Sequence, residues 1–153
     1  MTNNTAMNKQ PRDIPVIVEQ LYNVPVNALW DAITQVDQMK QWFFDNIPDF
    51  KPEVGFQTTF VVDAGERNYT HQWKILKAVP NKKITYDWTY AECEGEGVVT
   101  FELFDEGTKS SLRLTSVGLE TFPDDLPEFT RESGEAGWDY FIRQNLKKYL
   151  DGK

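Results

Sequence analysis

The stretch that decides the fold runs from residue 69 to residue 90 and reads YTHQWKILKAVPNKKITYDWTY. Large, mostly aromatic side chains alternate with polar ones in both of its halves, which is the period of a half-buried β-strand. Pro80-Asn81-Lys82 separates the halves and supplies the turn residues of a hairpin. Tyr69–Val79 and Lys83–Tyr90 are therefore predicted to be antiparallel neighbours with one apolar and one polar face.

The same alternation continues on both sides of this hairpin, and short turn segments separate its runs. It predicts an antiparallel meander that follows a separate first strand and two short helices. Pro25 suits the first turn of the first helix, where a missing N–H costs nothing. The further strands are expected over Ile14–Tyr22, Asp49–Lys51, Phe56–Val62, Gly97–Phe104 and Ser111–Gly118, and the helices over Pro25–Thr34 and Asp37–Phe43.

The last segment is predicted to be a long amphipathic helix that covers the apolar face of the sheet. Its start is expected at Asp125-Leu126-Pro127-Glu128, which has the carboxylate spacing of a helix cap. Apolar residues then recur at helical spacing from Trp138 to Leu150. Gly134 and Gly137 would allow a close approach to the sheet or a flexible gate; the alternative is only a loose helix start.

Composition indicates one globular domain over residues 14–151, after a disordered lead-in over residues 1–13. Of the 153 residues, 40% are hydrophobic and 26% are charged. The net charge of −8, with scattered Lys and Arg, argues against a nucleic-acid partner and against an anionic membrane surface. No apolar run is long enough to cross a membrane. Cys93 is the only cysteine, which excludes an intrachain disulfide and suits a cytoplasmic location.

Several short motifs, in this order, resemble one family. They are Asn23-Val24-Pro25 with Leu29-Trp30-Asp31-Ala32, Trp42-Phe43, Val79-Pro80-Asn81-Lys82-Lys83-Ile84, Val99-Thr100-Phe101-Glu102-Leu103, and Gly137-Trp138 with Leu146, Tyr149 and Leu150. The chain resembles the START-like (SRPBCC, Bet v allergen-like) superfamily, and within it single-domain bacterial members of the activator of heat-shock-protein-90 ATPase homologue family. The resemblance implies an α+β helix-grip fold, β-α-α-β6-α, in which a curved antiparallel sheet wraps around the long C-terminal helix and encloses a cavity.

The inward aromatic residues are the expected lining of that cavity. One interpretation is a pocket for a lipid or an aromatic molecule, and the alternative is a filled aromatic core, because periodicity does not distinguish a void from packed rings. The predicted ligand-binding residues are Trp30, Trp42, Phe60, His71, Trp73, Tyr86, Trp88, Phe101, Trp138, Phe141 and Ile142.

Catalytic signals are weak. His71 is the only histidine and the one candidate for a general base near neutral pH, but a histidine hydrogen-bonded inside the sheet is favoured. Asp87 falls on the polar phase and is expected to be solvated, as is the acidic turn around Cys93, whose thiol is expected to be inert. The chain contains no motif for a metal, a cofactor or a nucleophilic triad, so none is predicted.

The sequence therefore favours a cytoplasmic binding protein for a hydrophobic small molecule. Two alternatives stay open. The first is an interaction module that contacts a chaperone, which the family resemblance implies. The second is a cyclase- or hydratase-type enzyme that uses the same cavity, with His71 or an inward tyrosine as acid or base. The sequence leaves the ligand and the oligomeric state undetermined.

Overall fold

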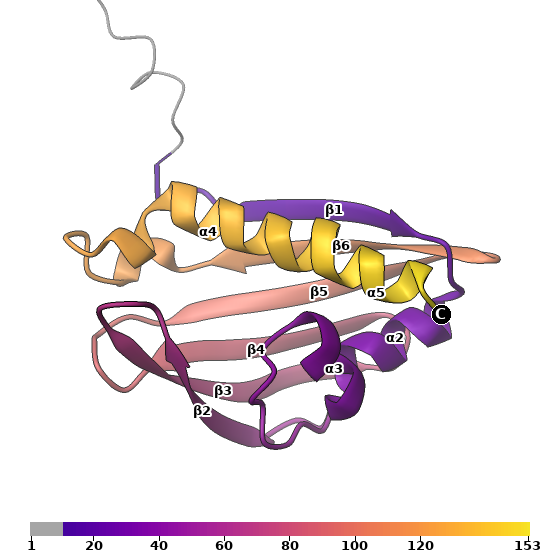
Figure 1. Ribbon diagram of the computed structural model, residues 1–153, viewed down its shortest axis with the longest axis horizontal. Helices are drawn as coiled ribbons and strands as arrows, with labels where there is room; N and C mark the ends of the chain where they lie inside the picture. The colour runs from indigo at the N-terminus through magenta and orange to yellow at the C-terminus, as the bar shows by residue number, and fades with distance from the viewer. Residues whose placement is uncertain (1–10) are drawn as a thin grey trace, which may run out of the picture.

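A computed structural model describes residues 11–153, so the lead-in expected over residues 1–13 falls mostly outside the described residues. Six antiparallel strands form one curved sheet in the order β1-β6-β5-β4-β3-β2 (Figure 1). Strands β2 to β6 are therefore neighbours in chain order, and β1 pairs with β6 at the far edge. The strands are β1 (Val16–Tyr22), β2 (Gln57–Asp63), β3 (Asn68–Val79), β4 (Lys83–Tyr90), β5 (Gly97–Glu106) and β6 (Lys109–Val117).

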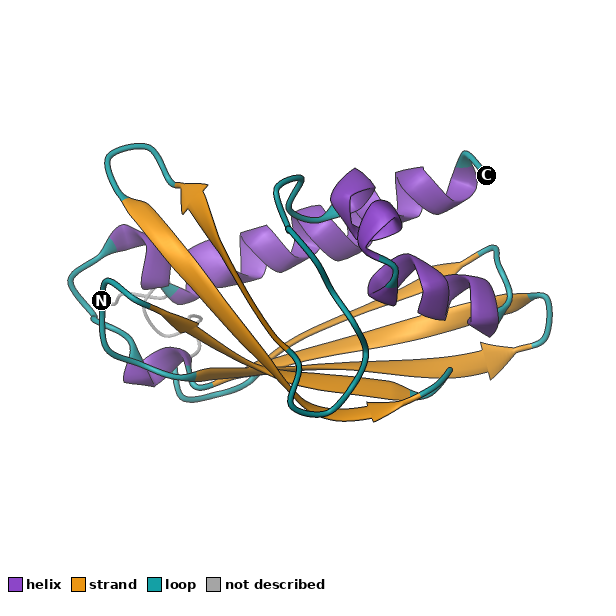
Figure 2. Cartoon of the chain, turned by 90° about the horizontal axis from the view of Figure 1, so that it is seen from below, coloured by secondary structure: helices purple, strands orange, loops and turns teal. Residues whose placement is uncertain are grey.

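The helices cover one face of the sheet. Figure 2 shows the long C-terminal helix and the pair α2 (Val26–Thr34) and α3 (Val36–Trp42) on the same side of the strands. The C-terminal helix runs through α4 (Arg131–Trp138), a π-helical middle segment (Asp139–Asn145) and α5 (Leu146–Asp151). Two 3₁₀ turns, Leu119–Thr121 and Pro127–Phe129, lie in the segment that joins β6 to α4. No described helix is both long enough and apolar enough to span a bilayer.

The predicted α+β helix-grip fold is confirmed, and so is the hairpin on which the prediction depended. β3 pairs with β4 so that Trp73 lies opposite Trp88 and His71 lies opposite Tyr90. Side chains that face each other across antiparallel strands share one side of the sheet. Tyr69, Trp73, Ile75 and Tyr86 are buried on that side, as the alternation predicted.

One predicted strand is wrong. Asp49–Lys51 has no regular secondary structure and pairs with no described strand. The backbone N–H of Phe50 instead donates to the side chain of Asp49 at 2.8 Å. Pro48 and Pro52 flank the segment, and proline has no N–H to offer a ladder. The segment buries Phe50 against Tyr86 and Trp73, at ring-centroid separations of 5.8 and 6.2 Å.

The predicted start of the last helix is also wrong. Pro127–Phe129 forms a single 3₁₀ turn, and Thr130 is extended with φ −72° and ψ 154°. The Thr130 hydroxyl then accepts a hydrogen bond from the backbone N–H of Ser133, so Thr130 and not Asp125 is the N-cap. Because Thr130 is extended, the 3₁₀ turn and α4 are separate elements, and Glu128 has no capping role in α4.

Two buried polar side chains join the helices to each other and to the sheet. The indole N–H of Trp42 donates to the carbonyl of Ala32 at 2.8 Å, which locks α3 against α2. The hydroxyl of Tyr22 donates to the carbonyl of Ile142 in the π-helical segment at 2.5 Å. A π-helix leaves backbone carbonyls displaced from the regular ladder, and here one of them is satisfied by the first strand.

We expect Gly118→Ala to destabilise the fold far more than Gly107→Ala, although both glycines have positive φ, 93° and 83°. A Cβ at residue 107 meets nothing within 4 Å, whereas a Cβ at residue 118 overlaps the carbonyl oxygen of Glu96. The left-handed backbone alone costs roughly 1–2 kcal/mol, so Gly107→Ala should lose about that much free energy of unfolding. Urea denaturation of both variants checks the difference, and equal losses would contradict it.

Candidate functional site

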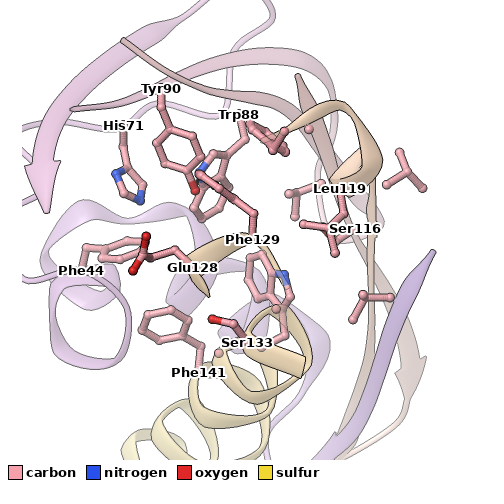
Figure 3. Close-up of a pocket in the computed structure, with 18 residues that line it drawn as sticks. Phe44, His71, Trp88, Tyr90, Ser116, Leu119, Glu128, Phe129, Ser133 and Phe141 are labelled. Carbon is pink, nitrogen blue, oxygen red and sulfur yellow. Dashed lines mark hydrogen bonds between the residues drawn. The ribbon is translucent and has the colours of Figure 1, made fainter. Parts of the chain in front are cut away.

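A pocket of about 290 Å³ lies between the first turns of the C-terminal helix and the adjoining end of the sheet (Figure 3). The sheet contributes residues from β1, β3, β4, β5 and β6, and the C-terminal helix, from α4 into its π-helical segment, supplies the opposite wall. Phe44, which follows α3, and the segment between β6 and α4 also border the pocket. The sheet wall consists of Val16, His71, Trp88, Tyr90, Gly97, Val99, Ser116 and Val117, and the helix wall of Ser133, Gly134, Gly137, Trp138 and Phe141.

The void exists because the helix has no side chain at two positions of this wall. A Cβ at Gly137 would meet nothing within 4 Å, and a Cβ at Gly134 would meet only the side chain of Leu119, at 4.0 Å. Leu119 also lines the pocket. Further along the same helix, Ile142, Leu146 and Leu150 are buried and fill the space against the sheet. The space between helix and sheet therefore stays open at the two glycines and is filled by side chains further along the helix.

An aromatic cluster closes the end of the pocket. Phe122 and Phe129 stack with ring centroids 5.0 Å apart, and both pack against Tyr90 at 5.5 Å. The Arg12 guanidinium fixes this segment from outside by donating to the carbonyls of Phe122 and Phe129, each at 3.0 Å. The segment is therefore held at its backbone and its rings, and both phenylalanines line the pocket.

His71 brings a neutral imidazole to the pocket. It is buried, with Nδ1 lying 3.2 Å from the carbonyl of Tyr69 on its own strand. Burial lowers the pKa of His71 to about 4, so the ring is uncharged at neutral pH. Because a carbonyl only accepts, Nδ1 is assigned as the protonated nitrogen, and Nε2 then keeps a lone pair.

Tyr90 brings a hydroxyl beside that imidazole. Its oxygen accepts a hydrogen bond from the indole N–H of Trp88 at 2.9 Å. Burial raises the pKa of Tyr90 well above its usual value, so the phenol stays protonated. Among the described residues the phenolic hydrogen has no acceptor. Figure 3 shows His71, Trp88 and Tyr90 close together on one side of the pocket.

Glu128 supplies the negative charge of the site. Its carboxylate accepts from Arg67 Nε at 2.9 Å, from the Arg67 Nη2 at 3.1 Å and from the Tyr69 hydroxyl at 2.8 Å. The Arg67 guanidinium, followed by the Tyr69 hydroxyl, lowers the pKa of Glu128 to about 2. The carboxylate is therefore ionised, and the arginine that neutralises it is already engaged.

The structure places only part of the predicted set at this pocket. His71, Trp88, Trp138 and Phe141 line it. The others are buried in the main core and lie outside the lining of this pocket: Trp30, Trp42, Phe60, Trp73, Tyr86, Phe101 and Ile142. For these residues the packing corresponds to a filled aromatic core, with Trp73 5.0 Å from the ring of Tyr86 and 4.8 Å from that of Phe60. Ligand contact remains a prediction for the four residues at the pocket.

Sequence reasoning missed three residues that shape the site. Tyr90 carried a usable signal, because it continues the inward phase of Tyr86 and Trp88. Glu128 was assigned to a helix cap, and nothing local indicated that Arg67 would reach it from 61 residues away. Phe44 follows the aromatic pair Trp42-Phe43 and enters the pocket because α3 ends at Trp42.

Of the acidic residues expected to be solvated, Asp87 is half-buried, whereas Glu92 in the acidic turn is exposed as expected. Asp87 has one buried carboxylate oxygen, Oδ1, with no hydrogen-bond partner in the described part of the chain, and burial, with Glu96 nearby, raises its pKa to about 6. Glu92 accepts hydrogen bonds from the backbone N–H of Thr70 at 2.7 Å and from its hydroxyl at 2.5 Å. Burial raises the pKa of the Cys93 thiol. Within residues 11–153, no group of three or more His, Cys, Asp or Glu side chains is placed to hold a metal ion.

A sheet curved around one long helix, with a pocket between them, defines a START-like helix-grip domain. The model of the family "Activator of Hsp90 ATPase homolog 1-like protein" matches residues 23–151. The chain belongs to this family. No curated protein matches the chain.

Solved structures with the same fold cover nearly the whole chain. A protein from Mesorhizobium loti is 30% identical, with a TM-score of 0.70 over 91% of this chain and 98% of that one. A protein from Chromobacterium violaceum is 17% identical, with a TM-score of 0.73 over 90% and 96%. The Aha1 dimer from Colwellia psychrerythraea is 17% identical, with a TM-score of 0.69 over 90% and 96%. The last two likenesses concern the fold alone.

We expect the buried His71 to make stability depend on pH. Its pKa is about 4 in the folded chain against 6.5 when exposed, so the unfolded chain binds more protons between these values. The free energy of unfolding should therefore be highest above pH 6.5 and fall as the pH drops to 4, by about 3 kcal/mol. Urea unfolding across this range, beside an NMR titration of the imidazole, measures both quantities.

His71→Phe is the matched control, because it keeps an aromatic ring among Phe44, Phe60 and Tyr90 but does not titrate. The carboxylates titrate in both proteins and cancel in the difference. A difference in stability between the two proteins that stays constant from pH 6.5 to pH 4 would show that His71 is not held neutral.

Proposed function

We propose that this protein binds a compact hydrophobic molecule, aromatic or lipidic, in the pocket between α4 and the sheet. The observation that carries the proposal is a cavity of about 290 Å³ with an aromatic and aliphatic lining and a few polar atoms. Small-molecule sites usually combine an apolar lining with a few orienting polar groups and occupy roughly 300–1,000 Å³. The volume lies just below that range, which favours a small ring system over a long acyl chain.

The ionisation of the site favours binding over catalysis. An acid or base is most effective when its pKa lies near the working pH. Burial moves the pKa of His71 down to about 4 and that of Tyr90 upward, so both groups move away from neutrality in opposite directions. Fixed hydrogen-bonding groups that do not titrate suit a binding site. The cyclase- or hydratase-type activity is therefore the weaker proposal for the same pocket.

We expect Gly134→Leu to weaken binding by at least about tenfold, which corresponds to 1.4 kcal/mol. The new side chain starts beside Leu119 and occupies part of the pocket. Naphthalene and lauric acid serve as probes, measured by the shift in melting temperature and by the fluorescence of Trp88 and Trp138. The unsubstituted protein should respond to at least one of them in a saturable way.

Gly152→Leu is the control for this variant. Gly152 ends the same helix far from the pocket, and a Cβ there makes only ordinary contacts, 3.5 Å or more from its neighbours. It should bind the probes as the unsubstituted protein does. Absence of any response across a wide set of small aromatic and lipid probes would rule out the proposed function.

Contact with a chaperone is a second candidate, favoured by the family name and by one surface feature. Leu21 and Phe104 both lie opposite Ser111 on the outer face of the sheet, and they are 42% and 40% exposed. Ile17, on the same strand as Leu21, is 55% exposed. Exposed apolar residues that form a row mark interaction surfaces more often than scattered ones do. We propose a cytoplasmic location both for this chaperone contact and for ligand binding in the pocket.

We expect the double variant Leu21→Ser/Phe104→Ser to weaken any binding to purified Hsp90 by at least about tenfold. The pocket lies on the opposite face, so probe binding should be unchanged and serves as the folding control. Surface plasmon resonance with immobilised Hsp90 measures the interaction. If the unsubstituted protein gives no signal at tens of micromolar, or the double variant binds equally well, this candidate fails.

A further inference from the structure

One side of the pocket presents a matched hydrogen-bond donor and acceptor. His71 and Tyr90 are direct partners across β3 and β4, and their rings meet edge to face with centroids 4.8 Å apart. The Tyr90 oxygen already accepts from Trp88, so its remaining capacity is to donate. The Nδ1 of His71 is engaged with the Tyr69 carbonyl, so the remaining capacity of the ring is to accept at Nε2.

Neither group finds its counterpart within the described residues. The Tyr90 hydrogen and the His71 Nε2 therefore both remain available to a molecule in the pocket. Buried polar groups are nearly always satisfied in folded proteins, by the chain, by water or by a ligand. A ligand that offers one acceptor and one donor at its polar end would satisfy both groups at once.

The charge of the pocket restricts what that polar end can be. Of the described residues that line it, Glu128 alone is charged at neutral pH. The nearby Arg67 directs Nε and Nη2 at that carboxylate. A carboxylate ligand would lose its hydration here and meet no cation in the lining, and the nearby Arg67 is already paired with Glu128.

We propose that the pocket selects an uncharged ring compound whose polar end is a hydroxyl or a carboxamide, bound by the Tyr90 hydroxyl and the His71 Nε2, and rejects carboxylates. This specificity rests on the proposed binding function and adds the chemical class of the ligand. An aromatic hydroxyl accepts from Tyr90 and donates to His71, and a carboxamide does so through its carbonyl oxygen and its N–H. The serine hydroxyls of the lining, Ser116 and Ser133, can donate or accept and do not alter this preference.

A series on one ring system tests the specificity. Naphthalene, 2-naphthol, 2-naphthamide and 2-naphthoate share the apolar body and differ in the polar end. We expect 2-naphthol and 2-naphthamide to bind about three- to tenfold more tightly than naphthalene by calorimetry at pH 7, as one or two net hydrogen bonds allow. We expect 2-naphthoate to bind at least about tenfold more weakly than 2-naphthol.

Tyr90→Phe tests whether the tyrosine is responsible. The variant keeps the ring that packs against Phe122 and Phe129 but removes the donor. The ratio of naphthol affinity to naphthalene affinity should fall to about one, and this ratio cancels any general loss of packing. Tyr149→Phe removes a hydroxyl that bonds Gln38, outside the pocket lining, and should leave the ratio unchanged.

The outcomes separate the two proposals. If none of the four compounds binds, the proposed function itself fails. If naphthalene binds but 2-naphthol and 2-naphthamide gain nothing, or if 2-naphthoate binds as well as they do, the pocket is a binding site without this specificity. The comparison of the four compounds in the unsubstituted protein decides this even if Tyr90→Phe fails to fold. If the Tyr90→Phe variant still binds 2-naphthol more tightly than naphthalene by the same ratio, the assignment to Tyr90 is wrong.

Discussion

The antiparallel pairing of β3 with β4 is the constraint on which the rest of the structure depends. It sets His71 opposite Tyr90, Trp73 opposite Trp88 and Ile75 opposite Tyr86, so one face of the sheet becomes almost continuously aromatic. Each buried aromatic side chain removes roughly 150–250 Å² from water. Such a face is stable only when something apolar covers it, and the long C-terminal helix and the α2–α3 pair provide the cover (Figure 2). A register shift of one residue would turn these rings to solvent.

The cover is complete at one end of the sheet and incomplete at the other. Ile142, Leu146 and Leu150 of the helix are fully or almost fully buried against the sheet, and Trp42 and Phe43 stack beside them with centroids 4.7 Å apart. Toward the start of the helix, Gly134 and Gly137 bring no side chain, and a space of about 290 Å³ remains. The fold therefore combines a packed core with a pocket toward the start of the last helix, and the same helix borders both.

The chemistry of the pocket follows from the same burial. Removing His71 from water favours its neutral form, and removing Tyr90 from water favours its protonated form, so both groups stay uncharged over a wide pH range. Glu128 is the exception, because Arg67 and Tyr69 hold its carboxylate in the charged form. For the proposed ligand, fixed protonation states imply recognition by shape and hydrogen bonding. The pocket takes its shape from the glycines of the helix wall. Its hydrogen-bonding groups include the uncharged His71 and Tyr90, and Glu128 is its one charged residue among those described.

The sequence by itself determined the hairpin, the strands of the meander apart from Asp49–Lys51, the amphipathic last helix and the family. These follow from local periodicity and turn residues, which act over a few neighbours. It also placed His71, Trp88, Trp138 and Phe141 on the inward face. Only the tertiary structure decided which inward residues pack and which line a void, because that depends on the distance between helix and sheet. It also decided the contact of Arg67 with Glu128, which joins residues that no local pattern connects, and the pairing of His71 with Tyr90, whose register depends on a bulge between Ile75 and Lys77 of the hairpin.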